Sequence, residues 1–213
     1  RSIDHRLWET WAHAILGLIY LELLAAGDAY HHLQRSRTMA EEVGSSFMVM
    51  VATNLLVSAC ILQDRHAEAA KLLPDRLPEP VSVMDYMLLN AIGELAMAQA
   101  DPSRALQLFD HVDLSDRSSW LGAMAYHFGR ILQLRGETLT RLDRLAEAEA
   151  DLQSLLRRYQ DQGVQMGWWR IHLGLGKLYQ AADDPKRAGA AFGAALAQVE
   201  ELAASVGDDN LRE

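Results

Sequence analysis

The sequence has 213 residues, of which 50% are apolar and 23% are charged, and it contains only 5 prolines. This composition excludes a disordered or low-complexity chain, and the length fits one large domain or two small ones. The 20 basic and 29 acidic residues give a formal charge of -9. Because nucleic-acid binders neutralise phosphates with surplus Lys and Arg, we expect no direct binding of nucleic acid by this segment.

The chain is expected to be a cytoplasmic part of a larger protein. It opens without an initiator Met or a signal sequence. Its single cysteine, Cys60, excludes a disulfide framework and a thiolate zinc site, and it fits a reducing compartment. The most apolar stretch, residues 47–62, contains Asn54 and is shorter than the roughly 20 residues that cross a bilayer, so we expect no membrane span.

Apolar residues recur along the chain with the period of a helix, and no window of useful length alternates between apolar and polar residues. The pattern therefore predicts an all-α fold without strands. We expect about ten helices, at residues 4–25, 28–43, 46–62, 65–73, 81–100, 102–111, 117–141, 143–161, 164–181 and 185–206.

A pattern spanning two helices repeats along the chain. It is clearest near the C-terminus, where it consists of Leu175, Gly176, Tyr179, Ala188, Phe192 and Ala195. The residues at the position of Gly176 are spaced 40, 36, 43 and 40 apart, and in chain order they are Gly17, Val57, Gly93, Gly136 and Gly176. A small residue at this position would allow two antiparallel helices to approach closely.

The Asp-Pro pairs support this register. Asp101-Pro102 and Asp184-Pro185 lie eight and nine residues after Gly93 and Gly176, respectively. Asp is a favourable N-cap and Pro suits the first helical turn, so each pair should begin the second helix of its unit. In the second unit, prolines at 74, 78 and 80 should cut the second helix short.

The pattern resembles the tetratricopeptide repeat (TPR), with its Leu-Gly-x-x-Tyr first helix and Ala-x-x-x-Phe-x-x-Ala second helix. The resemblance implies a single domain over residues 1–213 that forms a right-handed superhelical solenoid of about five antiparallel helix pairs. The repeats are expected at residues 4–43, 46–80, 81–113, 117–161 and 164–206. The first helix of each repeat would line a concave groove.

The long repeats and the acidic turn at residues 40–44 resemble the sensor region of the maltose-regulon activator family of signal-transduction ATPases and related LuxR-type regulators. This resemblance implies a non-catalytic segment that binds a protein, a peptide or an effector within a larger bacterial-type transcriptional or signalling regulator. Neither an ATPase motif nor a helix-turn-helix occurs in the sequence, so neither activity is assigned to it.

The TPR resemblance also implies which positions face the groove. They lie three and six residues before the Gly position and one, four and five residues after it. The candidate partner-binding residues at these positions are Asn54, Asn90, Arg130, Gln133, Arg170, Lys177, Trp11 and Met87. An Asn amide can donate to and accept from an extended peptide backbone, and Arg can bind a carboxylate. The alternative is that the Asn residues satisfy local backbone groups and the Arg residues solvate a helix edge.

We expect no catalytic residue, metal site or cofactor. The adjacent His31 and His32 point about 100° apart on a helix, which does not favour a shared metal ion. Cys60 occupies the position of the repeat Tyr, so it should be a buried apolar side chain. No paired carboxylates or Ser-His-Asp arrangement is recognisable.

The last helix, residues 185–206, has small and apolar residues around much of its circumference. Because a solenoid normally ends in a helix with a polar outer face, this helix predicts self-association or packing against the parent protein. A second interpretation of the whole chain is therefore a structural spacer or oligomerisation module of a multidomain enzyme, with no ligand of its own.

Overall fold

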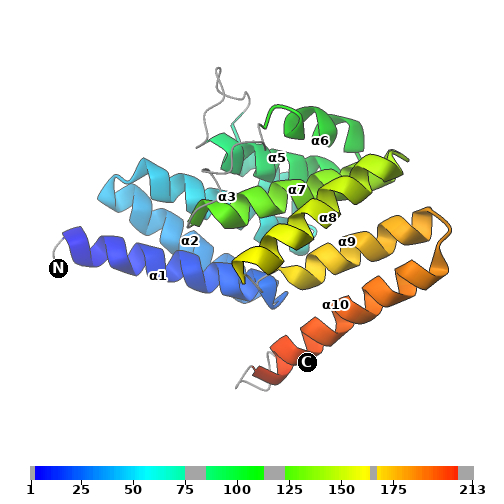
Figure 1. The fold of residues 1–213 in the computed structure, drawn as a ribbon. Helices are drawn as coiled ribbons and strands as arrows, with labels where there is room; N and C mark the ends of the chain where they lie inside the picture. Colours follow the sequence, from blue (N-terminus) through cyan, green and yellow to red (C-terminus); the bar gives the residue numbers. More distant parts are fainter. Residues whose placement is uncertain (1–2, 75–84, 113–122, 164–166, 206–213) are drawn as a thin grey trace. The chain divides into compact units, whose positions relative to one another are not determined.

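A computed structural model describes residues 3–74, 85–112, 123–163 and 167–205. In this part of the chain there are ten α-helices and no strand, which confirms the predicted all-α class (Figure 1). The helices are α1 (Ile3–Glu22), α2 (Ala26–Val43), α3 (Ser46–Leu62), α4 (His66–Leu72), α5 (Tyr86–Ala98), α6 (Pro102–Phe109), α7 (Ala123–Arg141), α8 (Leu145–Gln162), α9 (Trp168–Ala181) and α10 (Pro185–Ser205). Within the described ranges, no helix has the length and apolar character needed to cross a membrane.

Local signals place most helix ends within a few residues of the predicted ones. α6 and α10 begin at Pro102 and Pro185, as predicted. Asp184 caps α10, because its Oδ1 accepts a hydrogen bond from the backbone N–H of Arg187 at 3.0 Å. α9 begins at Trp168 and not at residue 164, because Gly167 at φ 81° interrupts helical geometry. The predicted segments at 81–84, 117–122 and 164–166 lie outside the described residues.

The chain divides into two compact units, Arg1–Asp101 and Pro102–Glu213. The first contains α1–α5 and the second contains α6–α10. The boundary falls between the two helices of the third predicted repeat, and the single-domain organisation stays a prediction.

In the first unit, each helix packs against the following helix, and first helices also pack against one another. α1 contacts α2 and α3, while α3 contacts α4 and α5. One core cluster joins the first three helices through Ala14, Ala40 and Met48. A second cluster joins α3, α4 and α5 and contains the buried residues Val57, Cys60, Ala69, Ala91 and Leu95. Burial of Cys60 and the short α4 confirm two predictions.

The second unit is built in the same way. α7 contacts α8 and α9, and α9 pairs with α10 (Figure 1). Close approach depends on the predicted glycines: a Cβ atom at Gly136 would collide with Leu152, and one at Gly176 would collide with Phe192. In the first unit, Gly17 lies against Leu33 in the same manner. The expected role of these glycines in close helix packing is therefore confirmed.

Five turns of one geometry connect helices that are neighbours in the chain. Each contains a non-glycine residue with φ between 55° and 61°, at Leu24, Asp64, Ala100, Asp143 and Asp183. The next backbone N–H donates to the carbonyl five residues earlier, as from Ala25 to Tyr20 and from Asp184 to Tyr179, both at 2.9 Å. This bond satisfies carbonyls that the helix end would leave free. All five residues lie seven positions after a Gly position, so the turns recur with the spacing of the sequence pattern.

Candidate functional site

Two contacting helices of the first unit carry a row of polar side chains at the predicted groove positions. Asn54 on α3 and Asn90 on α5 are 3% and 2% exposed. One turn further along, Ser58 donates a hydrogen bond to the Glu94 carboxylate across the two helices at 2.5 Å. We name Asn54, Ser58, Asn90 and Glu94 the α3–α5 polar row. It combines two amides with a hydroxyl and a carboxylate, and Asn54, Asn90 and Glu94 are buried.

One acceptor in this row has no hydrogen bond in the described part of the chain. The Oδ1 atom of Asn90 is buried and lacks a partner there. An unsatisfied buried acceptor costs about 1–3 kcal/mol, so a ligand that donates a hydrogen bond to Asn90 would recover that free energy. The geometry therefore gives Asn90 a capacity to bind a donor such as a backbone N–H.

In the second unit, the predicted groove residues of α7 are joined into a chain. Arg130 donates to Gln133 at 2.9 Å, and the Gln133 amide donates to Glu137 at 2.8 Å. Gln133 is buried and the other two are partly exposed. We name these three residues the α7 polar row. Its three side chains are thus linked to one another by two hydrogen bonds along the helix.

Two predicted residues, Arg170 and Lys177, lie on α9, a helix that contacts α7. The Arg170 guanidinium stacks on the ring of Trp169, with its central carbon 4.3 Å from the ring centroid. Lys177 is exposed two turns further along the helix. Arg170 is therefore held by an aromatic neighbour, while Lys177 is available to an acidic ligand.

The two apolar candidates pack within the first unit. Trp11 is half-buried, and its ring lies 5.9 Å from that of Phe47, centroid to centroid. Met87 is almost fully buried on α5. Both side chains thus contribute to packing in the structure as it stands, and their role as contacts for a partner stays a prediction.

Sequence reasoning did not single out Ser58 and Glu94. Both lie one residue after the Gly position, at Val57 and Gly93, which is a position the TPR template assigns to the groove. Their position in the repeat pattern was therefore enough to place them on the groove face. The hydrogen bond between them became visible only once α3 and α5 were packed together.

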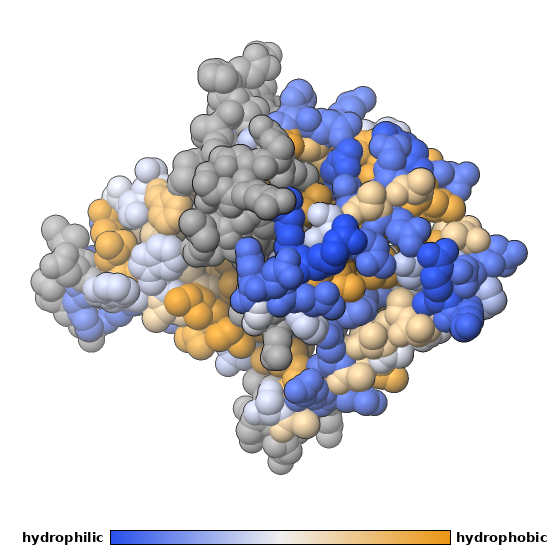
Figure 2. All heavy atoms as spheres, in the orientation of Figure 1, coloured by the Kyte–Doolittle hydropathy of each residue, from blue (hydrophilic) through white to orange (hydrophobic). Residues whose placement is uncertain are grey.

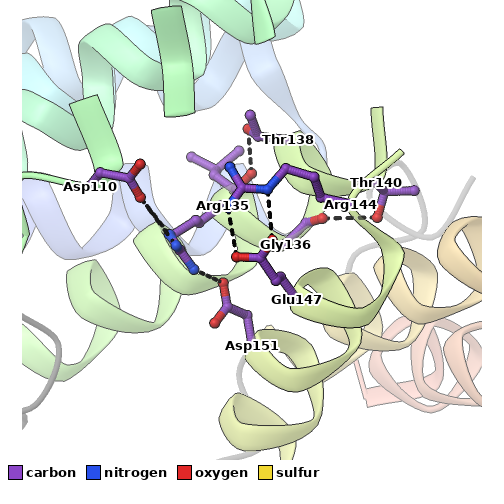
Figure 3. Close-up of polar contacts among 9 residues, drawn as sticks. Asp110, Arg135, Gly136, Thr138, Thr140, Arg144, Glu147 and Asp151 are labelled. Carbon is purple, nitrogen blue, oxygen red and sulfur yellow. Dashed lines mark hydrogen bonds and ion pairs between the residues drawn. The ribbon is translucent and has the colours of Figure 1, made fainter. Parts of the chain in front are cut away.

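The second unit also contains a cavity of about 340 Å³ between α6, α7 and α8 that the sequence did not indicate. Its lining comprises Phe109, Asp110, Val112, Leu132, Arg135, Asp151, Ser154 and Arg158. Arg135 lies between two of these residues, donating to Asp110 at 3.1 Å and to Asp151 at 2.5 Å (Figure 3). Two carboxylates bind this guanidinium, so it links the turn after α6 to α7 and α8.

Burial and pairing oppose each other at this ion pair. Burial raises the pKa of Asp151, and attraction to Arg135 offsets only part of that increase. Burial lowers the pKa of Arg135, but Asp151 and Asp110 outweigh it, so the pKa is raised overall. Arg135 therefore stays charged, and Asp151 is the member of the pair that titrates. This arrangement is typical of a structural ion pair that holds neighbouring segments together.

Two histidines of the first unit lie side by side, and its cysteine is buried. The Nδ1 atoms of His13 and His32 lie 2.9 Å apart. The pKa of His13 is lowered mainly by burial and, to a smaller extent, by repulsion from His32. Among the described residues, no group of three or more His, Cys, Asp or Glu could hold a metal ion. Burial raises the pKa of the Cys60 thiol to about 11, which disfavours a nucleophilic thiolate.

No protein-family model, curated protein or solved structure shows a significant match to the chain. The relation to TPR proteins and to the regulator family therefore stays a prediction from the sequence pattern. The functional proposal rests on the geometry of the helices and their polar rows.

Proposed function

We propose that the chain is a TPR-type scaffold, a right-handed solenoid of helix pairs that binds a protein or peptide along its first helices. The five equivalent turns support this architecture, because they recur with the spacing of the Gly positions. The contacts of Gly17, Gly136 and Gly176 with a side chain 16 residues later support the same helix-pair unit. Within each unit, packing of a helix on the next helix of the chain, as of α1 on α2 and of α9 on α10, is typical of repeat proteins.

The role we propose is binding without catalysis. The observation that carries it is the buried Oδ1 of Asn90, which has no hydrogen-bond partner among the described residues. Asn90 occupies a predicted groove position on α5, which packs against α3, the helix of Asn54. An extended peptide could donate a backbone N–H to Asn90 and accept from its amide nitrogen. Because Asn90 is 2% exposed, the covering side chains must move before a ligand reaches it, and we expect slow association.

The proposed setting is a cytoplasmic, bacterial-type transcriptional or signalling regulator of which this chain is the sensing or partner-binding segment. A ligand would act by fitting one curvature of the helix array better than another, which shifts the balance between the two. The acidic net charge of -9 supports a protein, peptide or effector ligand over a nucleic acid.

The test compares Asn90→Leu with the wild-type chain in two measurements. In urea unfolding of the free chain, the substitution should be neutral or slightly stabilising, because it removes an unsatisfied acceptor. In peptide binding, sequences selected by the wild-type chain from an unbiased displayed library should bind the variant about 10-fold more weakly. Gln34→Leu, at an exposed amide on α2, is the matched control and should leave both measurements unchanged.

The outcomes separate the two roles of Asn90. A fall of several kcal/mol in the unfolding free energy would assign Asn90 to the core and remove the main support for the proposal. Failure of the library to yield any peptide that distinguishes the variant from the control would contradict peptide binding at this row.

A structural spacer or oligomerisation module is the second candidate function. The observation that favours it is the exposed apolar surface on α1 and α10, where Trp8, Ile15, Leu196 and Val199 face solvent. Such surface is typical of an interface between proteins. If this function holds, substitutions on those helices alter assembly while the peptide measurement above shows no binding.

A further inference from the structure

α1 presents an apolar face that nothing in the described chain covers. Trp8 is 73% exposed, Ile15 is 52% exposed and Ile19 is 42% exposed, and Leu16 lies beside them. These positions fall on one side of a helix. No Asp, Glu, Lys or Arg occurs between Glu9 and Glu22. Figure 2 shows apolar surface over the part of the view that α1 occupies in Figure 1.

The equivalent positions in the next first helix are buried. Forty residues later, on α3, the places of Trp8, Ile15, Leu16 and Ile19 are taken by Met48, Leu55, Leu56 and Ala59, all of them buried. They are covered because α3 packs against the preceding pair, α1 and α2. The exposed face of α1 is therefore the surface on which a preceding helix pair would pack.

The same comparison holds in the second unit. α9 packs against the preceding α7 and α8. The positions on α9 equivalent to Ile15, Leu16 and Ile19 are Gly174, Leu175 and Leu178, which are buried. Burial of this face is thus the rule for a first helix that has a helix pair before it.

α10 also presents exposed apolar residues, but it is the second helix of its pair, whereas α1 is a first helix. Val199 is 39% exposed and Leu196 is 58% exposed, and Phe192 is only partly buried. Forty residues earlier on α8, Leu152 and Tyr159 occupy the places of Phe192 and Val199 and are buried, since α9 follows α8 and packs on it. α10 is a second helix with no following first helix among the described residues.

We propose that a second copy of this chain covers these faces, with α10 of one copy packed on α1 of the next as α8 packs on α9. The two faces are of complementary kinds, one belonging to a first helix and the other to a second helix. Each copy offers one face of each kind, so the contact joins two different surfaces of the chain. The inference does not depend on peptide binding at Asn90.

The experiment measures mass by analytical ultracentrifugation over a range of concentrations. The wild-type chain should form species whose average mass rises with concentration. Ile15→Glu with Ile19→Glu places two charges on the α1 face, and Leu196→Glu with Val199→Glu places two on α10. Each double variant should sediment as a single chain. Gln34→Glu with Thr38→Glu, at two exposed positions on α2, is the matched control and should assemble like the wild type.

An equimolar mixture of the two double variants provides the decisive result. The α1 variant keeps an intact α10 and the α10 variant keeps an intact α1, so the mixture should form a species of two chains and no larger. Loss of assembly in the α1 variant alone, without recovery in the mixture, would indicate a two-fold α1 contact and overturn the proposal. A wild-type chain that remains a single chain at every concentration would also overturn it.

Folding of the variants is checked independently. All positions are exposed and Glu is a good helix former, so circular dichroism should match that of the wild type. If a double variant loses helicity, mixing Ile15→Cys chains with Leu196→Cys chains under oxidising conditions replaces it, because Cys60 is buried. A disulfide-linked dimer of one chain of each kind is expected, and disulfides only between identical chains would contradict the proposal.

Discussion

Glycine at the contact between paired helices controls how closely they approach. At Gly17, Gly136 and Gly176, a Cβ atom would collide with Leu33, Leu152 and Phe192, respectively. In each case the partner is a side chain on the second helix of the pair, 16 residues later. The single missing methyl group therefore sets the distance between the helices of a pair.

Gly176→Ala should destabilise the chain. The added methyl group meets the Phe192 ring, and overpacking of this kind costs about 1–3 kcal/mol. The matched control is Gly193→Ala in the middle of α10, where a Cβ atom meets nothing within 4 Å. That substitution should increase stability by about 0.5–1 kcal/mol, because Ala loses less entropy in a helix than Gly. Urea unfolding monitored by circular dichroism measures both, and equal effects would contradict this account.

At the scale of the elements, the turns carry backbone strain at non-glycine residues. Leu24, Asp64, Ala100, Asp143 and Asp183 adopt left-handed backbone angles. For residues with a Cβ atom this conformation costs roughly 1–2 kcal/mol. The hydrogen bond that closes each turn and the packing of the two helices must outweigh that cost.

Ala100→Gly should stabilise the chain by about 0.5–1 kcal/mol, because relief of left-handed strain exceeds the added flexibility of the unfolded chain. The same substitution at Ala190, exposed in the interior of α10, should instead cost about 1 kcal/mol. Thermal and urea unfolding of the two variants should therefore shift in opposite directions. A loss of stability at both positions would show that the turn is not strained.

Helix ends were predictable where the signal was local. α3 runs from Ser46 to Leu62 as expected, and the Asp-Pro pairs mark the beginnings of α6 and α10. The start of α9 was missed because the left-handed geometry of Gly167 was not anticipated. Signals of this kind need only a few neighbouring residues, which is why most of the elements followed from the sequence.

The candidate site was only partly predictable. The register placed Asn54 and Asn90 on first helices, but it could not predict their burial, which depends on residues far away in the sequence. The Arg135 bridge to Asp110 and Asp151 was missed for the same reason, since Asp110 follows α6 while Arg135 and Asp151 lie on α7 and α8. The periodic pattern predicts which face of a helix a residue lies on, but it does not predict which residues of other helices pack against that face.

At the scale of the whole molecule, carboxylates with opposite pKa shifts determine how stability depends on pH. Burial raises the pKa of Asp151 above its ordinary 3.8. Hydrogen bonds from Arg144 and Arg187 lower the pKa values of Glu147 and Asp184 below their ordinary 4.5 and 3.8. The folded state thus binds a proton more tightly than the unfolded state at Asp151 and less tightly at Glu147 and Asp184.

The sign of the effect at Asp151 can be tested with Asp151→Asn. In the wild type, the pKa of Asp151 is 3.8 in the unfolded state and higher in the folded state. Between these two pKa values, the folded state holds a proton that the unfolded state has released. The unfolding free energy therefore falls as the pH rises through this range. The variant should lack this component, so the difference in slope between the two chains reports Asp151 alone. Glu147→Gln is the control of opposite sign, since it removes stability that is lost as pH falls below 4.5. Urea unfolding at a series of pH values measures both, and identical slopes for wild type and Asp151→Asn would refute the assignment.

The short connections between packed helices also have a consequence for folding kinetics. α1 packs on α2 and α3, and α7 packs on α8 and α9, so much of each unit consists of contacts between segments that are close in the sequence. Little loop-closure entropy is lost before such contacts form, and proteins of low contact order fold quickly. Each helix pair can also become ordered as soon as its two helices are synthesised, before the next pair exists.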